Sequence, residues 1–171
     1  MVKLAVERAN REVRAKGEGG ATTLTMAFVV GNEATVGHVG DTRAYQIDNV
    51  SMQQLTKDHS LVQQLIDTGT ITEDEAAVHP QRNVLWNAIG KAIDVRVDVA
   101  THVLPPESYL LICSDGLWGV LPEERILEIV HELDIPQLIT ETLVTEANKS
   151  GGTDNVTAVV VKFPEISADA E

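Results

Sequence analysis

Three aspartates in this sequence stand beside glycine or asparagine; two follow an apolar run, and the third leads into one. Asp41 follows Gly40, Asp115 precedes Gly116, and Asp154 precedes an asparagine. Glycine beside a carboxylate lets the backbone approach an ion and its bound waters. Because a rigid sheet holds the loops at its strand ends, carboxylates converging there form a hard oxygen site suited to Mn²⁺ or Mg²⁺. The residues therefore predict a divalent metal site.

Each of the three segments taken alone also fits an ordinary turn, because Asp-Gly and Asp-Asn are common turn pairs. Two features favour the metal site. The preceding strands are strongly apolar, so an ionised acid at their ends needs a partner. Cations are also scarce, since only five Lys or Arg side chains occur from Lys91 to Phe163. These features favour the metal site and leave the turns as the alternative.

The sequence offers little support for cysteine or histidine chemistry. Cys113 is the single cysteine, so it forms no internal disulfide and no Cys-based zinc site, and a reducing compartment is expected. It lies in the apolar run 109–113, which favours buried packing over a nucleophile. His38, His59 and His79 could bind metal or transfer protons, but no two histidines have i,i+4 spacing. We therefore interpret each as structural.

The length and the net charge of the chain limit the classes of protein to which it can belong. The 171 residues match one ordinary domain. With 13 basic and 26 acidic residues, the net charge of −13 argues against nucleic acid or an anionic membrane as a general partner. No apolar stretch approaches the roughly 20 residues of a membrane span, and the N-terminus lacks the apolar block of a secretory signal. A soluble, cytoplasmic protein is expected.

Hydrophobic periodicity predicts the elements that position the three acids. A first helix has one apolar face, and glycines from Gly17 onward end it; the face is Val2, Val6, Ala9 and Val13. The predicted strands, of which the first three have the spacing of antiparallel hairpins, are 22–30, 34–39, 43–47, 95–103, 109–113 and 156–163. Short helices are expected after Ser60 and Thr72 and over 83–89, and two longer ones open at Pro122 and Pro136. This order favours an α+β layered domain.

Several segments, in this order along the chain, resemble the metal-dependent serine/threonine phosphatases of the PPM or type 2C class. They are GDTRAY (40–45), LTKDHS (55–60), ICSDGLW (112–118) and GTDNVT (152–157), with GATTL (20–24) and HPQRN (79–83) as weaker matches. The resemblance covers about residues 4 to 163. It implies an antiparallel β-sandwich flanked by helices, a four-layer α/β/β/α fold. Residues 1–171 would form a single phosphatase-like domain, with a flap at about 57–94 and a frayed tail at 165–171.

The resemblance also implies an activity, the hydrolysis of phosphoserine and phosphothreonine in proteins. In this family two metal ions, Mn²⁺ or Mg²⁺, share a bridging water that attacks the phosphorus. Carried over by position, Asp115 and Asp154 would be ligands of the first metal, and Asp41 would be the ligand of a third, weaker metal. Many members have a further aspartate where this chain has Gly119.

The family's N-terminal motifs, Arg followed by Asn-Glu-Asp and then Asp-Gly-x-Gly-Gly, have no counterpart before Val2. The chain is therefore expected to hold the C-terminal two-thirds of a phosphatase domain, truncated at the N-terminus, with impaired activity. Its exposed sheet edges would be covered by self-association or by an N-terminal partner segment. The alternative is a non-catalytic phosphatase-like interaction or regulatory module that keeps the scaffold.

Overall fold

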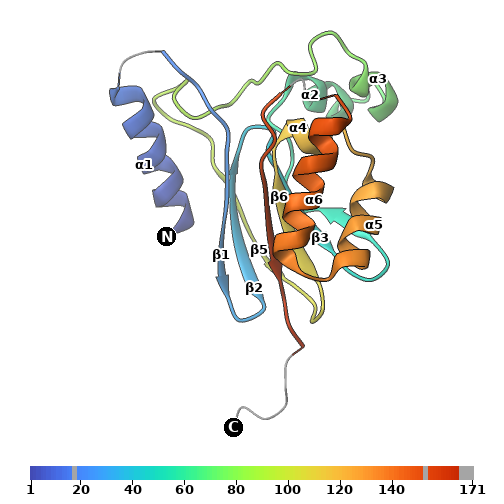
Figure 1. Cartoon of the computed structure of the whole chain (residues 1–171). Helices are drawn as coiled ribbons and strands as arrows, with labels where there is room; N and C mark the ends of the chain where they lie inside the picture. Colours follow the sequence, from blue (N-terminus) through green and yellow to red (C-terminus); the bar gives the residue numbers. More distant parts are fainter. Residues whose placement is uncertain (17–18, 152–153, 166–171) are drawn as a thin grey trace. The chain divides into compact units, whose positions relative to one another are not determined.

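The computed structural model describes residues 1–16, 19–151 and 154–165 (Figure 1). The helices are α1 (Val2–Ala15), α2 (Leu61–Asp67), α3 (Glu73–Ala77), α4 (Asp115–Trp118), α5 (Glu123–Leu133) and α6 (Pro136–Lys149). The strands are β1 (Leu24–Val30), β2 (Glu33–Val39), β3 (Arg43–Ile47), β4 (Met52–Gln54), β5 (Asp98–Val103), β6 (Tyr109–Cys113) and β7 (Ala158–Lys162).

The chain divides into two compact units, and each is described by itself. The first unit comprises Met1–Ala27, Thr35–Thr42 and Lys57–Ala100. The second unit comprises Phe28–Ala34, Arg43–Thr56 and Thr101–Glu171. The expected frayed tail falls almost wholly on residues 166–171, which lie outside the described residues.

Helix α1 packs on β2 within the first unit through the apolar face expected from its spacing. Val2 and Val6 are buried. They come so close to Gly37 that a Cβ there would lie 2.3 Å from Val2 Cγ1, so this approach requires glycine. The predicted helix is thereby confirmed, although its predicted end at Gly17 lies outside the described residues.

The same face of α1 carries a buried polar residue, Asn10. Its Nδ2 donates to the carbonyl oxygens of Ala92 and Ile93 at 3.0 and 3.2 Å, and its Oδ1 accepts from the Gly90 N–H at 2.7 Å. Three hydrogen bonds therefore tie α1 to a turn about 80 residues further along the chain.

One sheet has the strand order β1-β2-β5. Strands β1 and β2 follow each other through the turn at Gly31, whose φ of 58° suits glycine. The expected strand 95–103 is shorter than predicted, because β5 begins at Asp98. The expected hairpin between 34–39 and 43–47 is wrong, because β2 and β3 belong to different sheets. The positive φ of Gly40, 113°, redirects the chain between them.

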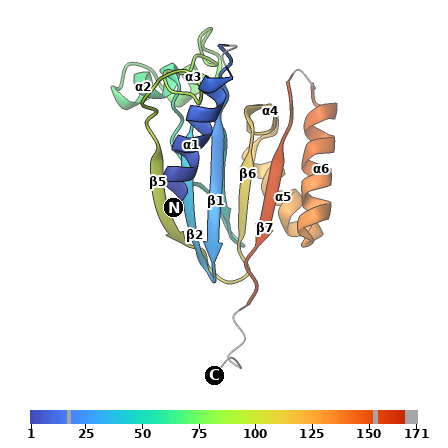
Figure 2. The same cartoon turned by 90° about the vertical axis from the view of Figure 1, so that its left-hand side faces the viewer.

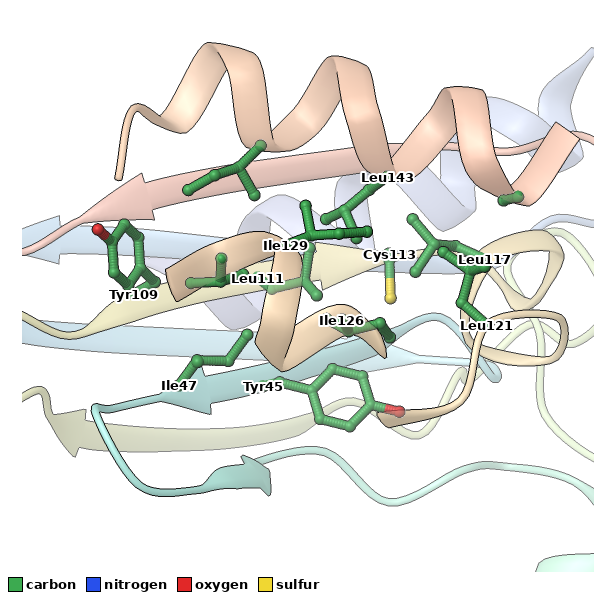
Figure 3. Packing of buried hydrophobic residues seen from close by; sticks show 13 residues of the cluster. Tyr45, Ile47, Tyr109, Leu111, Cys113, Leu117, Leu121, Ile126, Ile129 and Leu143 are labelled. Atoms are coloured by element: carbon green, nitrogen blue, oxygen red, sulfur yellow. The ribbon is translucent and has the colours of Figure 1, made fainter. Parts of the chain in front are cut away.

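The second unit is built on an antiparallel sheet with the order β4-β3-β6-β7. Strand β6 is central and pairs Cys113 with Arg43 on one side and with Ala158 on the other. Helix α6 runs along β7 (Figure 2), and α5 packs against α6. Apolar side chains of the sheet and of the helices α4, α5 and α6 form the core (Figure 3), which includes Tyr45, Leu111, Leu117, Ile129, Ile139 and Leu143.

Two predicted helix starts in the segment 57–94 are confirmed by their hydrogen bonds. The Ser60 hydroxyl accepts from the Gln63 N–H at 3.2 Å and caps α2. At α3, Thr72 and Glu75 bond each other's backbone N–H groups in a capping box.

The third helical turn expected over 83–89 is wrong. These residues instead form isolated bridges to distant parts of the chain, Leu85 with Ser60 and Ile89 with Thr22. Their backbone groups are used in these long-range bonds, so they are not available for a local helix. Within the described ranges of the chain, no helix has both the length and the apolar character that crossing a membrane would need.

Candidate metal-binding site

Asp115 occupies the first position of α4, two residues beyond the end of β6. The strand before it is buried and is paired on both sides, so the start of α4 is held by the rigid part of the second unit. The Gly116 N–H donates to Asp115 Oδ1 at 2.9 Å. The aspartate is half-buried, so one carboxylate oxygen is used locally while the group remains accessible.

Asp154 lies in the loop that leads into β7 and is exposed. Its Oδ1 accepts from the Asn155 N–H at 2.7 Å, the same local arrangement as at Asp115. Residues 152 and 153 of the GTDNVT segment lie outside the described residues.

Hydrogen bonds interlock the two loops that carry these aspartates. The Ser114 N–H donates to the Thr157 carbonyl at 3.1 Å, and the Thr157 N–H donates to Ser114 Oγ at 3.0 Å. The Ser114 hydroxyl donates to the Asn155 carbonyl at 3.1 Å. A Cβ on Gly116 would lie 2.5 Å from the Asn155 carbonyl oxygen, so this close approach also depends on glycine. The segments of Asp115 and Asp154 are therefore neighbours at one end of the β6–β7 pair.

A cation–π contact supports α4 from the neighbouring strand β3. The Arg43 guanidinium carbon lies 3.5 Å from the ring centroid of Trp118, and Arg43 Nη1 donates to the Tyr45 hydroxyl at 3.2 Å. This direct link between Arg43 and Trp118 helps to orient the helix that begins at Asp115.

The donor chemistry of this end of the sheet fits a divalent cation. Neither Asp115 nor Asp154 forms an ion pair with a described residue. Mg²⁺ in proteins is commonly held by one or two carboxylates together with waters and substrate phosphates. Among residues 1–16, 19–151 and 154–165, no three His, Cys, Asp or Glu side chains form a group that could hold a metal ion. At this end of the sheet, the described residues thus supply the carboxylates of Asp115 and Asp154 as candidate ligands. Their role as ligands stays a prediction.

Asp41, the third predicted ligand, belongs to the first unit, where it follows the end of β2 and is half-buried. The residue before it, Gly40, has a φ of 113°, and a Cβ there would lie 2.4 Å from Thr23 Cγ2. The residue after it, Thr42, is bonded through its carbonyl to the Thr25 hydroxyl at 2.8 Å and through its own hydroxyl to Thr23 Oγ1 at 2.7 Å. The backbone on both sides of Asp41 is thus firmly fixed to β1 and the residues before it.

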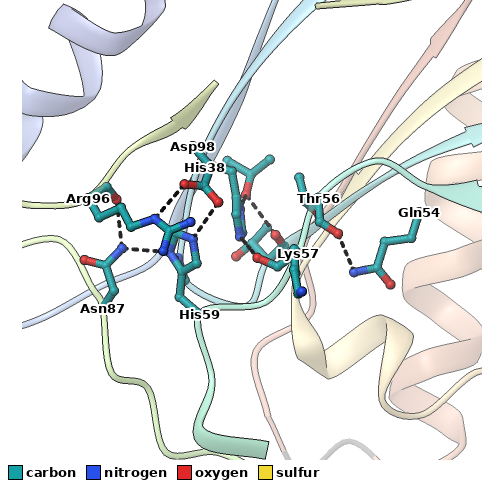
Figure 4. A network of polar contacts seen from close by, with 11 residues as sticks. His38, Gln54, Thr56, Lys57, His59, Asn87, Arg96 and Asp98 are labelled. Carbon is teal, nitrogen blue, oxygen red and sulfur yellow. Dashed lines mark hydrogen bonds and ion pairs between the residues drawn. The ribbon is translucent and has the colours of Figure 1, made fainter. Parts of the chain in front are cut away.

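A polar network with a buried centre adjoins the Gly40–Asp41 turn within the first unit (Figure 4). Its central residue is His59, which is 2% exposed. His59 Nδ1 accepts from the Gly40 N–H at 3.2 Å and from Asn87 Nδ2 at 2.7 Å. His59 Nε2 contacts Asp98 Oδ2 at 3.2 Å, and Arg96 Nε donates to the other oxygen of Asp98 at 3.0 Å.

The electrostatics of the network follow from burial. Burial lowers the pKa of His59, and the Asp98 carboxylate offsets only part of this effect. Burial alone would raise the pKa of Asp98, but the hydrogen bonds from His59 and Arg96 outweigh it and lower that pKa. The pair is therefore a neutral imidazole donating to an ionised carboxylate. From the sequence we interpreted His59 as structural and did not single out Asp98 or Asn87. These two partners lie 39 and 28 positions further along the chain, so no local pattern links them to His59.

The predicted flap range contributes one wall of a pocket in the first unit. The pocket has a volume of about 610 Å³. One side is lined by Asn83, Val84, Leu85, Ala88, Gly90 and Lys91, and the other by Gly19, Ala21, Thr22 and Thr23. Asn83, the last residue of the HPQRN segment, lines this pocket opposite the GATTL segment, and the Thr22–Ile89 bridge joins the two walls. Whether 57–94 acts as a flap stays a prediction.

We compared the sequence and the structure of this chain with those of known proteins. No protein-family model matches it. The protein phosphatase PhpP of Streptococcus pneumoniae is 40% identical over 152 residues, which cover 88% of this chain and 61% of PhpP. The chain thus spans about three fifths of the length of the curated relatives that it matches.

Two solved structures show the same fold. The PPM Ser-Thr phosphatase MsPP from Mycobacterium smegmatis, solved in complex with cacodylate, superposes with a TM-score of 0.84 and 37% identity over 93% of this chain and 71% of that one. The catalytic domain of the serine threonine protein phosphatase PstP, in complex with two manganese ions, gives a TM-score of 0.78 and 32% identity over 92% and 67%.

The antiparallel sheets, the helices beside them and these likenesses define an α+β protein of the phosphatase type, so the predicted fold class is confirmed. The chain belongs to the PPM family of serine/threonine protein phosphatases.

Proposed function

We propose that this chain is the metal-binding part of a protein serine/threonine phosphatase that hydrolyses phosphoserine and phosphothreonine esters. The observation that supports this most directly is the interlocked pair of loops at residues 114–116 and 155–157. They bring Asp115 and Asp154 to the same end of two paired strands, in a chain of the PPM family. PhpP and MsPP are named as phosphatases, and PstP was solved with two manganese ions.

In this proposal each described residue has a defined task. Asp115 and Asp154 bind one Mn²⁺ or Mg²⁺ ion, and Asp41 contributes to a further, weaker metal site. Gly116 permits the close approach of the two loops, and Arg43 keeps α4 in place through Trp118. When bound, the metal supplies an activated water for attack on phosphorus and neutralises charge on the phosphoryl oxygens.

Substrates and partners are part of the same proposal. Phosphoproteins are the substrate class that the relatives' names indicate. The proposed partner is either a second copy of the chain or a segment that corresponds to the part of the relatives that this chain does not match. Such a partner would cover the exposed apolar residues Phe28, Val29 and Val30 of β1. A single cysteine, buried in β6, supports a cytoplasmic location.

Calorimetric titration with Mn²⁺ tests the metal site. We expect Asp115→Asn to weaken binding at least about tenfold, because a neutral amide replaces a charged ligand in a site with few of them. The matched control is Asp94→Asn, which changes an exposed aspartate in a loop of the first unit and leaves Mn²⁺ binding as in the unsubstituted chain. Equal binding by the Asp115→Asn variant and the unsubstituted chain removes Asp115 from the ligand set.

A second experiment decides between an enzyme and a non-catalytic interaction module. The part of PhpP that this chain does not match is supplied as a separate polypeptide together with Mn²⁺, and phosphate release from a phosphothreonine peptide is measured. Release that disappears in Asp115→Asn supports the phosphatase. If no release occurs while the two polypeptides associate and the peptide binds, the interaction module is the better description.

A further inference from the structure

We infer that His59 is the positioning residue of the Gly40–Asp41 turn, through which residues 86–98 hold the predicted metal ligand Asp41. The inference rests on the proposed function for the ligand role of Asp41 and adds to it a residue that does not itself touch the metal. It is based on contacts within the first unit alone.

His59 contacts the turn through two different groups. Its backbone N–H donates to the Gly40 carbonyl at 2.7 Å, and its ring Nδ1 accepts from the Gly40 N–H at 3.2 Å. Both polar groups of the Gly40 backbone are therefore satisfied by one residue. Since Gly40 immediately precedes Asp41, the direction in which the aspartate leaves β2 depends on the place of His59.

The hydrogen bonds define the tautomer that this role requires. The Gly40 N–H and the Asn87 side-chain amide are both donors, so Nδ1 is the unprotonated nitrogen. Asn87 Nδ2 also donates to the Arg96 carbonyl at 2.8 Å, which fixes the orientation of this amide. The proton then lies on Nε2, where it is donated to Asp98. Protonation of Nδ1 would break the bond to Gly40.

Residues from 86 to 98 surround the ring from several sides. The backbone N–H of Trp86 donates to the His59 carbonyl at 3.0 Å, and the ring centroids of the two residues lie 4.8 Å apart. Asp98, at the start of β5, accepts the hydrogen bond from His59 Nε2–H and is itself held by Arg96. A displacement of this segment is therefore passed through one imidazole to Gly40.

The two ring nitrogens have separate tasks, and two substitutions separate them. In His59→Asn the side-chain oxygen lies near the place of Nδ1 and can still accept from Gly40, whereas the bond to Asp98 is lost. In His59→Gln the longer amide can still reach Asp98, whereas the acceptor for Gly40 is lost. A merely structural role, in which His59 fills space, predicts no such difference between the two variants.

Amide hydrogen exchange on the full 171-residue chain measures the effect without any metal. We expect His59→Gln to raise the exchange rates of Gly40 and Asp41 about tenfold or more, the usual effect of a buried donor without its acceptor, and His59→Asn to stay within about threefold of the unsubstituted chain. Equal rates in the two variants, or no change in either, overturn the positioning role.

A measurement on the unsubstituted protein covers the case in which both variants fail to fold. In ¹⁵N-labelled protein, an N–H···N hydrogen bond gives a scalar coupling between the Gly40 amide nitrogen and His59 Nδ1. Presence of this coupling supports the inference, and its absence overturns it.

Calorimetry with Mn²⁺ separates the inference from the proposed function. If Asp41 is a ligand, His59→Gln and Asp41→Asn each weaken Mn²⁺ binding, and the double variant is no weaker than Asp41→Asn alone. If Asp41→Asn binds Mn²⁺ as the unsubstituted chain does, the ligand role of Asp41 fails. The exchange rates of Gly40 and Asp41 then still decide the positioning role.

Discussion

His38 and His59 are two buried imidazoles whose ring centroids lie 4.8 Å apart. His38 Nδ1 contacts the Thr25 hydroxyl at 2.8 Å, and its Nε2 contacts the Lys57 carbonyl at 3.1 Å. Burial, followed by the proximity of His59, lowers the pKa of His38 to about 4. At neutral pH both rings are therefore uncharged parts of the first unit.

The depressed pKa of His38 makes stability depend on pH. Below its ordinary pKa of 6.5 the unfolded chain binds a proton at this position that the folded chain takes up only near pH 4. Stability from this group is thus complete above pH 6.5 and is lost as the pH falls toward 4. We expect a loss of about 2 kcal/mol between about pH 7.5 and about pH 5, measured by urea denaturation.

His38→Gln is the variant that isolates this effect. The glutamine amide can still donate to the Lys57 carbonyl but does not titrate. The variant should therefore lose about 2 kcal/mol less stability than the unsubstituted chain over the same pH range. An identical pH dependence in His38→Gln and the unsubstituted chain contradicts the assignment of the effect to His38.

Sequence reasoning at the residue scale succeeds where the chemistry is local. Asp115 could be singled out because a glycine follows it and a buried strand precedes it. The burial expected for Cys113 is confirmed, and burial raises the pKa of its thiol to about 12. The sequence did not predict the hydrogen bonds of His59 and Asn10, because their partners lie many residues away along the chain. The pattern of a single sequence does not show which distant residues come into contact.

At the scale of elements, α6 shows how much of the structure a helical period determines. Ile139, Leu143 and Ala147 recur every fourth residue, the spacing of one helix face, and all three are fully buried. We expect Leu143→Ala to lower the free energy of unfolding by about 3 kcal/mol, because it removes apolar contacts and leaves a cavity in a packed core. Urea denaturation followed by tryptophan fluorescence measures the loss.

Leu138 on the same helix is the matched control, since it is 43% exposed. Leu138→Ala makes the same chemical change and should cost less than about 1 kcal/mol. Similar losses for the two variants would mean that α6 is not packed as the structure shows.

The errors at this scale also have a physical cause. The segment 83–89 has residues compatible with a helix, but its backbone groups are used in bridges to Ser60 and Thr22. Strands β2 and β3 have hairpin spacing, yet they enter different sheets because the turn between them is held by side chains from elsewhere in the first unit. Local periodicity predicts an element, whereas its pairing partner is decided by distant residues.

At the scale of the whole molecule, strong acidity and an exposed apolar edge act in opposite directions. The net charge of −13 makes copies of the chain repel one another. Phe28, Val29 and Val30 at the end of the edge strand β1 are exposed by 46%, 37% and 62%. Uncovered apolar edges favour association. Which effect dominates depends on the ionic strength.

We therefore expect self-association that grows with salt. Between about 0.01 M and about 0.15 M ionic strength the screening length falls from about 30 Å to about 8 Å, which weakens the repulsion but not the apolar attraction. Sedimentation equilibrium should show a larger average mass at the higher ionic strength, and Val30→Lys should abolish the increase. Val50→Lys, at an equally apolar and 88% exposed loop position, is the control and should behave as the unsubstituted chain. A salt-independent monomer contradicts the expectation.

The three bonds from Asn10 to residues 90–93 have a consequence for the way the protein is made. Helix α1 leaves the ribosome long before its anchoring turn has been synthesised. At about 5–20 residues per second, the intervening 80 residues take roughly 4 to 16 s. During that interval the polar side chain of Asn10 is without the three partners that it has in the folded first unit, so the final attachment of α1 waits for residues 90–93.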